Sequence, residues 1–165
     1  MLTLNAESRI EILLTDVDGC MTDGGMYFGP DGQALKRFDA KDGYGLKMLQ
    51  RSGVLVAWVT TDDSAITRSR FEALRLDLIR NGCPDKKEGV QSVLAEAGCG
   101  PDEAVFVGDD LSDLVVLGEV ATFIAPADAV QEVRAKADAV TAAPGGHGAI
   151  REICEAIIEH NEALQ

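Results

Sequence analysis

Short apolar runs alternate along the chain with segments in which apolar residues recur at helical spacing. The runs are almost continuous in apolar residues, as expected for strands buried on both faces of a sheet. They predict strands at Ile10 to Thr15, Val54 to Thr60, Leu76 to Arg80, Ala104 to Val107, Thr122 to Ala125 and Ala139 to Thr141. The intervening segments predict helices at Gly43 to Arg51, Asp63 to Leu74, Lys86 to Glu96, Leu111 to Gly118, Val130 to Lys136 and Ala149 to Glu162. This order predicts an α/β fold with a doubly wound, Rossmann-like parallel sheet and helices on both faces.

One segment interrupts the alternation. The stretch GGMYFGPDGQALKRFD, at about residues 24–39, predicts two short strands around a turn at Gly29 to Gly32, because Gly-Pro-Asp-Gly is a strong turn sequence. We therefore expect a β-hairpin inserted after the first strand. The sequence contains no linker, and its 165 residues fit one domain that spans residues 1–165.

Charged and hydroxyl residues follow several of the predicted strands, at the edge where ligands bind in open α/β sheets. The set comprises Asp16, Asp18, Thr60, Thr61, Lys86, Asp109, Asp110 and Asp113. Asp is also a common helix N-cap and turn residue, which is the alternative explanation for any one of these acids. Gly19 allows the chain to turn after Asp18, so that both carboxyl groups of this pair can face one ligand.

The acids of this edge imply a cation. Two unit charges about 4 Å apart repel by about 4 kcal/mol at an effective dielectric constant near 20. Carboxylate oxygens suit Mg²⁺, and bound Mg²⁺ would attract a phosphate group to a chain whose net charge is −13. The same net charge is unfavourable for binding nucleic acid, and we expect no such partner.

The cysteines and the apolar runs indicate in which cellular compartment the protein is expected. Cys20, Cys83, Cys99 and Cys154 form no CxxC pair, which favours free thiols in a reducing environment. The N-terminus has no basic segment followed by a long apolar one, and the longest apolar run, VLVAWV, is too short to cross a bilayer. We therefore expect a cytoplasmic protein with no signal peptide and no membrane association.

Four stretches, in order, resemble the motifs of the haloacid dehalogenase superfamily. They are DVDGCMTDG, the strand end at Thr60, Lys86 and GDDLSD. The resemblance implies a Mg²⁺-dependent phosphatase, in which Asp16 is the nucleophile and forms an aspartyl-phosphate. It implies that Asp18 protonates the leaving alcohol and then activates the water that hydrolyses the intermediate.

The same resemblance implies roles for the other motif residues. Thr60 would hydrogen-bond a phosphoryl oxygen, and Lys86 would neutralise charge on the phosphate and the nucleophile. The metal ligands would be Asp16, the backbone carbonyl of Asp18, and Asp109. Asp113 would hold the metal or its waters from behind these ligands, and Asp110 is a further supporting residue.

The segments between the motifs are too short for the cap domain that covers the site in many members of the superfamily. The hairpin, FDAKDGYGL and GGHGAIRE resemble the 3-deoxy-D-manno-octulosonate 8-phosphate phosphatases and their nonulosonate 9-phosphate relatives. This resemblance implies a phosphorylated keto-deoxy sugar acid as substrate. It also implies a homotetramer, built by the hairpins, in which a neighbouring subunit roofs the site. Alternatively, Met26, Tyr27 and Phe28 of the hairpin fold back on their own core.

The residues that would select the substrate are less closely defined by the resemblance. The candidates are Thr61, Asp62, Gly43, Arg70, His147 and Arg151, with Lys41 or Arg37 as alternatives for the substrate's acid group. The segment that contains His147 is equally explained as a glycine-rich loop before a helix. The octulosonate enzymes usually have Gly-Arg after the motif threonine, whereas this chain has Thr61-Asp62. This reversal of charge makes a nine-carbon sugar-acid 9-phosphate a second candidate substrate.

Two further functions remain open. One is a phosphatase for another small phosphomonoester. The other is a catalytically idle regulatory or assembly domain, which would commonly have lost the nucleophile, the acid/base residue or the lysine. This sequence retains Asp16, Asp18 and Lys86, which favours an enzyme.

Overall fold

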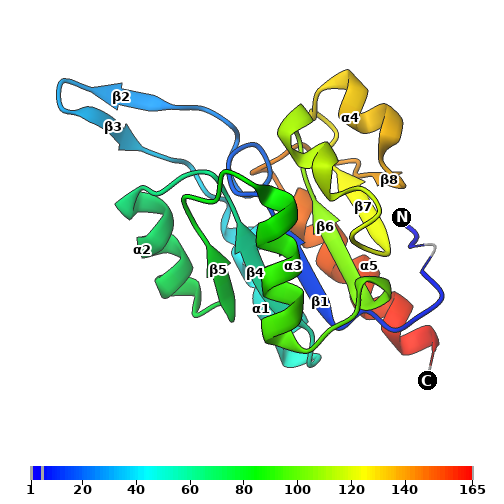
Figure 1. Cartoon of the computed structure of the whole chain (residues 1–165). Coiled ribbons are helices and arrows are strands. Elements are labelled where there is room, and N and C mark those ends of the chain that lie inside the picture. The colour runs from blue at the N-terminus through cyan, green and yellow to red at the C-terminus, as the bar shows by residue number, and fades with distance from the viewer. Residues whose placement is uncertain (1, 5, 165) are drawn as a thin grey trace.

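The computed structural model describes residues 2–4 and 6–164, which form a six-stranded parallel sheet flanked by helices (Figure 1). The strands are β1 (Ile12–Thr15), β4 (Leu55–Val59), β5 (Leu78–Arg80), β6 (Ala104–Val107), β7 (Thr122–Ala125) and β8 (Ala139–Val140). Their order in the sheet is β5-β4-β1-β6-β7-β8. The chain thus winds outward from β1 in both directions, which confirms the predicted doubly wound sheet. The order of winding reverses beside β1, where such sheets bind ligands.

Helices cover both faces of the sheet. On one face α1 (Ala40–Arg51) and α5 (Ala149–Ala163) pack over a core that includes Leu13 of β1. On the other face α3 (Lys86–Ala97) and α4 (Gln131–Lys136) pack over a core that includes Ile12 and Leu14. Alternate residues of β1 therefore enter different cores, which explains why the strand is apolar at every position. The remaining helix, α2 (Ala65–Leu74), joins β4 to β5 and adds Leu74 to the first core.

The hairpin lies where the sequence predicts it, after β1. Its strands β2 (Tyr27–Gly29) and β3 (Gly32–Leu35) pair antiparallel and project away from the sheet (Figure 1). Four large apolar side chains are exposed on it, and they are Met26, Tyr27, Phe28 and Leu35. The hairpin therefore does not bury these side chains against its own subunit.

The helix predicted at Leu111 to Gly118 is present, but it is shorter and is not an α-helix. This segment forms a 3₁₀-helix, η2 (Leu111–Val116), and a second one, η1 (Pro101–Glu103), precedes β6. In η2 the Asp113 carboxylate accepts hydrogen bonds from the backbone N–H groups of Asp109 and Asp110. These hydrogen bonds join the first turn of η2 to the loop that follows β6.

Other boundaries differ by a few residues. The helix α1 begins three residues before the predicted Gly43, because the Asp39 side chain caps it by accepting a hydrogen bond from the N–H of Lys41. The last strand ends one residue before the predicted Thr141, whose N–H still donates to the carbonyl of Ala125 in β7 and whose hydroxyl donates to the carbonyl of Ala143. Within the described part of the chain, no helix is both long enough and apolar enough to span a bilayer.

Candidate active site

Asp16 and Lys86 meet at the carboxyl end of the sheet. Asp16 follows β1, and Lys86 is the first residue of α3. The Lys86 Nζ lies 2.9 Å from Asp16 Oδ2 and 2.5 Å from Asp113 Oδ1. All three residues are buried. The fold thus holds one ammonium group between two carboxylates that come from β1 and η2.

Asp109, after β6, completes an acidic cluster. Carboxylate oxygens of Asp16, Asp109 and Asp113 lie within 4.8 Å of one another. Burial raises the pKa of Asp16 to about 6, although Lys86 partly offsets this effect. Burial, followed by the charges of Asp16 and Asp113, raises the pKa of Asp109 to about 7. The cluster therefore carries more negative charge than Lys86 compensates, and its oxygen donors fit a hard divalent cation such as Mg²⁺.

Within this cluster Asp113 has both carboxylate oxygens engaged. Its Oδ1 faces Lys86, and its Oδ2 accepts from the N–H groups of Asp109 at 3.0 Å and Asp110 at 3.1 Å. Burial alone would lower the pKa of Lys86, but the charges of Asp16 and Asp113 outweigh it and raise the pKa, so the amine stays protonated. Asp113 is thus arranged to orient its neighbours rather than to offer a free oxygen.

The motif glycines permit this close packing. Gly19 has a φ of +82°, and a Cβ atom there would lie 2.0 Å from Asp109 Oδ2. A Cβ on Gly108 would lie 2.4 Å from the Cβ of Asp113. Any side chain at either position would displace a member of the acidic cluster. The turn expected after Asp18 is therefore present, with a steric reason that the sequence alone does not reveal.

These side chains border a polar cavity of about 280 Å³. Its lining includes Asp16, Asp18, Thr61, Lys86, Asp109 and Asp110. Thr60 is buried at the end of β4, where its hydroxyl oxygen accepts the N–H of Asp62 at 3.1 Å. Its hydroxyl proton has no acceptor among the described residues and could be donated to an anion. The structure thus brings the six principal motif residues, Asp16, Asp18, Thr60, Lys86, Asp109 and Asp113, to one edge of the sheet.

Asp18 has a partner that the sequence reasoning missed. Lys36, directly after β3, places its Nζ 2.8 Å from Asp18 Oδ2 and 3.1 Å from Asp62 Oδ2. Burial by itself would raise the pKa of Asp62, but hydrogen bonds from Ser64, Thr67 and Lys36 lower it to about 2. Asp62 is therefore ionised and engaged by Lys36. The sequence offers no clear signal for Lys36, because its partners lie in separate segments that only the folded hairpin brings together.

The other predicted substrate residues lie outside this cluster. The Arg70 guanidinium carbon is 5.6 Å from the centre of the Phe38 ring, and its Nη2 would be 2.7 Å from a Cβ on Gly43. Its buried Nε has no hydrogen-bond partner among the described residues. Arg70 is thus a cation whose Nε is left unpaired by the part of the chain that the structure describes, and its role in binding substrate stays a prediction.

The two predicted residues near the C-terminus are occupied by local contacts. Arg151 Nε lies 2.6 Å from Glu155 Oε1 on the same helix, and its guanidinium carbon is 5.4 Å from the centre of the Tyr44 ring. His147 is exposed, and its Nδ1 is 2.8 Å from the carbonyl oxygen of Gly145. Neither residue lines the acidic cavity, so their contact with a substrate also stays a prediction.

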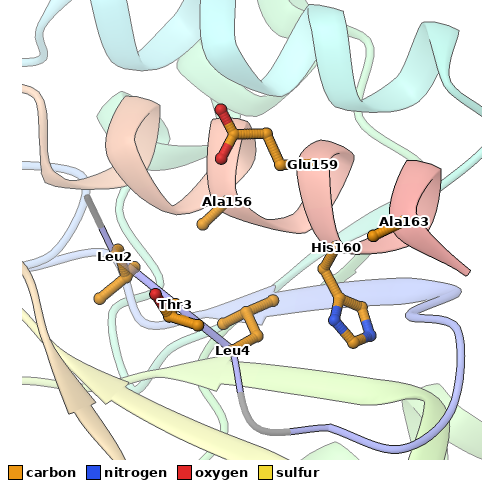
Figure 2. A pocket seen from close by; sticks show the side chains of 7 residues that line it. All are labelled: Leu2, Thr3, Leu4, Ala156, Glu159, His160 and Ala163. Carbon is orange, nitrogen blue, oxygen red and sulfur yellow. The ribbon is translucent and has the colours of Figure 1, made fainter.

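A second hollow lies between the N-terminal segment and α5 (Figure 2). It has a volume of about 250 Å³ and is lined mainly by aliphatic groups such as those of Leu2, Leu4 and Ala156. Figure 2 shows His160 extending from α5 toward the N-terminal segment, and its Nε2 is 2.9 Å from the carbonyl oxygen of Ser8. This hollow lacks the converging carboxylates of the first cavity and does not resemble a phosphate site.

Comparison with known proteins agrees with this geometry. A model of the haloacid dehalogenase-like hydrolase family matches residues 47–153. The 3-deoxy-D-manno-octulosonate 8-phosphate phosphatase of Yersinia pestis is 36% identical over 158 residues, which cover 96% of this chain and 84% of that protein.

Solved structures of similar enzymes superpose closely on this chain. The cobalt-bound deoxy-D-mannose-octulosonate 8-phosphate phosphatase of Haemophilus influenzae has a TM-score of 0.91 and 34% identity, and the match covers 93% of this chain and 90% of that one. The 3-deoxy-D-manno-octulosonate 8-phosphate phosphatase of Moraxella catarrhalis, solved with magnesium, phosphate and KDO, has a TM-score of 0.88 and 31% identity, with 94% and 91% covered.

Proposed function

The chain belongs to the haloacid dehalogenase-like hydrolase family, and we propose that it hydrolyses a phosphorylated keto-deoxy sugar acid through an aspartyl-phosphate on Asp16. The observation that carries this proposal is the buried cluster in which Lys86 contacts Asp16 and the carboxylate oxygens of Asp16, Asp109 and Asp113 converge within 4.8 Å. Phosphoryl transfer requires mainly positioning and charge stabilisation, and this cluster is built to supply both.

The residues divide the reaction between them. A carboxylate oxygen of Asp16 attacks phosphorus, and the bond from phosphorus to the sugar oxygen breaks as Asp18 gives that oxygen a proton. Asp18 then takes a proton from water, which attacks the aspartyl-phosphate, releases phosphate and restores Asp16. Lys86 offsets charge on Asp16 and the phosphoryl group throughout.

A metal ion would share this charge. Asp16, Asp109 and the backbone carbonyl of Asp18 would hold Mg²⁺, and Asp113 would orient them. Bound Mg²⁺ supplies charge neutralisation and polarisation of the phosphoryl oxygens. Asp16 and Asp109 suit the ion because burial, together with the neighbouring carboxylates, raises their pKa values, and a cation beside them would stabilise their ionised forms.

Octulosonate 8-phosphate is the first candidate substrate, since the relatives that match nearly the whole chain are named as octulosonate 8-phosphate phosphatases. A nonulosonate 9-phosphate is the second. It is favoured by Asp62, which stands where the octulosonate enzymes usually have arginine and which carries a full negative charge in contact with Lys36. An ion pair beside Thr61, which lines the cavity, differs in charge from a free arginine at the same place.

We also propose that the protein is a homotetramer in which the hairpins associate. The support is the exposed apolar surface of the hairpin, where the Phe28 side chain is 69% exposed. A neighbour's surface would close a cavity that has no cap domain above it. Light scattering should give the mass of four chains, and Phe28→Asp should reduce this mass, whereas a wild-type monomer would contradict the proposal.

A cytoplasmic location is proposed as well, and it is supported by the four cysteines, all of which are free thiols.

Release of phosphate tests the function. Octulosonate 8-phosphate and a nonulosonate 9-phosphate should be assayed side by side with Mg²⁺ and with EDTA, and other small phosphomonoesters should serve as comparison substrates. We expect efficient hydrolysis of one sugar-acid phosphate, dependent on Mg²⁺. Preference for an unrelated phosphomonoester would replace the substrate class. Absence of turnover on every substrate would favour an idle domain.

A further inference from the structure

Lys36 is a buried ammonium group that the hairpin brings to the edge of the candidate site. Its side chain is 0% exposed, and its Nζ lies 2.8 Å from Asp18 Oδ2, 3.1 Å from Asp62 Oδ2 and 3.2 Å from Thr67 Oγ1. The three oxygens come from the loop after β1, the loop after β4 and α2. One lysine therefore connects three segments that are distant in sequence.

Such an arrangement is a poor way to add stability. Moving an ammonium group out of water is unfavourable, and apolar side chains of similar volume often replace buried ion pairs without loss of stability. The main effect of these contacts on Lys36 is to fix the position of its ammonium group. A lysine held by Asp62 and Thr67 has little freedom, so its contact with Asp18 fixes the direction of that carboxylate.

Asp18 is otherwise free to turn. Its side chain is 38% exposed, and within the described residues its only side-chain hydrogen bond is the one that joins Oδ2 to Lys36. The other oxygen, Oδ1, has no hydrogen-bond partner in that part of the chain. Because Asp18 borders the cavity, holding Oδ2 leaves Oδ1 as the oxygen that can exchange a proton with a substrate.

We propose that Lys36 is a positioning residue, which Asp62 and Thr67 anchor and which aims Asp18 at the oxygen of the leaving alcohol. The proposal rests on the proposed phosphatase function and on the part of Asp18 as acid and base. It gives Asp62 a role other than direct contact with the sugar. It also links the hairpin to the chemistry, since Lys36 directly follows β3.

The test separates proton donation from general damage. The ratio kcat/KM reports on the steps up to phosphoryl transfer to Asp16, and a sugar-acid phosphate needs a proton on its leaving oxygen whereas p-nitrophenyl phosphate needs little. Lys36→Met should lower kcat/KM for the sugar-acid phosphate by about 100-fold, but for p-nitrophenyl phosphate by less than about tenfold. Lys136→Met is the matched control and should change neither value, because this lysine lies on the surface of α4 and its one ion pair among the described residues is with Glu132.

A double-mutant cycle gives the decisive comparison. In an Asp18→Asn background, Lys36→Met should lower kcat/KM by less than about twofold, because the group that Lys36 aims can no longer donate a proton. Equal losses on both substrates, or losses that multiply in the double variant, would overturn the proposal. If Lys36→Met does not fold, Lys36→Gln serves in the same cycle, since its amide retains donors for Asp62 and Thr67.

The two proposals fail differently. A wild-type protein that hydrolyses no phosphomonoester would remove the proposed function, and the cycle would then lose its basis. An active wild type whose Lys36 and Asp18 variants act independently would remove only the role of Lys36.

Discussion

A Cβ atom on Gly145 would lie 1.8 Å from the carbonyl oxygen of Gly19. The glycine-rich loop before α5 therefore approaches the loop after β1 more closely than any side chain would permit. A hydrogen bond stabilises this contact, in which the Gly146 N–H donates to the carbonyl of Cys20 at 3.0 Å. The segment that contains His147 thus has a packing function, which is to support the loop that carries Asp18.

Gly145→Ala should destabilise the protein and reduce its activity together. The new methyl group must displace backbone rather than a flexible side chain, and we expect the free energy of unfolding to fall by about 2 kcal/mol. Chemical denaturation measures this change. Gly29→Ala is the matched control, because the nearest atom to its Cβ would be 3.6 Å away and its φ is not positive. Similar losses in the two variants would mean that the close approach to Gly19 is unimportant.

Asp16→Asn should abolish turnover and leave the fold intact. Removal of a nucleophile typically lowers kcat by more than about a thousandfold. The pKa of Asp16 is raised to about 6, so its ionised form costs stability in the folded protein at neutral pH. Without Mg²⁺ at pH 8, the neutral amide should therefore unfold at the same temperature as the wild type or at a higher one. Substantial turnover by a correctly folded Asp16→Asn protein would assign the nucleophile elsewhere.

Mg²⁺ should stabilise the protein more at high pH than at low pH. The folded-state pKa values of Asp16 and Asp109 lie near 6 and 7, above the ordinary value of 3.8. Stability that these groups give when protonated is complete below their ordinary pKa and is lost as the pH rises through about 7. Mg²⁺ then takes the place of the protons, so the rise in melting temperature that it causes should be larger at pH 8 than at pH 5.

Two variants make this metal experiment specific. Asp109→Asn should remove most of the Mg²⁺-dependent rise in melting temperature and should also make activity insensitive to added Mg²⁺. Asp31→Asn, in the exposed turn of the hairpin, changes the net charge equally and should retain the full rise. A rise that is the same at both pH values and in all three proteins would indicate nonspecific binding.

The sequence predicts the sheet and the motif cluster because both depend on local patterns. Strands such as β1 and β6 are buried on both faces and so are apolar throughout, and the acids that follow them must meet at one edge of a parallel sheet. The 3₁₀ geometry of η2 is not predictable in this way. In η2 the Asp113 carboxylate accepts a hydrogen bond from the Asp109 N–H and also contacts Lys86 of α3, and this second partner is remote in sequence.

Lys36 illustrates a second limit. A lysine after an exposed strand is usually a solvated residue, and nothing in QALKRFD indicates that this one is buried. Its environment arises from the return of the hairpin to the sheet, where residues 18, 62 and 67 happen to surround its ammonium group. The interpretation of Asp62 from sequence as a substrate contact likewise could not include the lysine that engages it.

An exchange of charge between Lys36 and Asp62 tests whether this pair serves the fold or the reaction. In Lys36→Glu the new carboxylate would face Asp18 and Asp62, and the repulsion should lower both the melting temperature and kcat. Adding Asp62→Lys restores an ion pair at the same place, so the melting temperature should recover in part. Activity should not recover, because Asp18 would now face a carboxylate and would turn away from the cavity. Recovery of both properties would mean that the pair acts only through stability, and that Asp18 needs no cation to hold it in place.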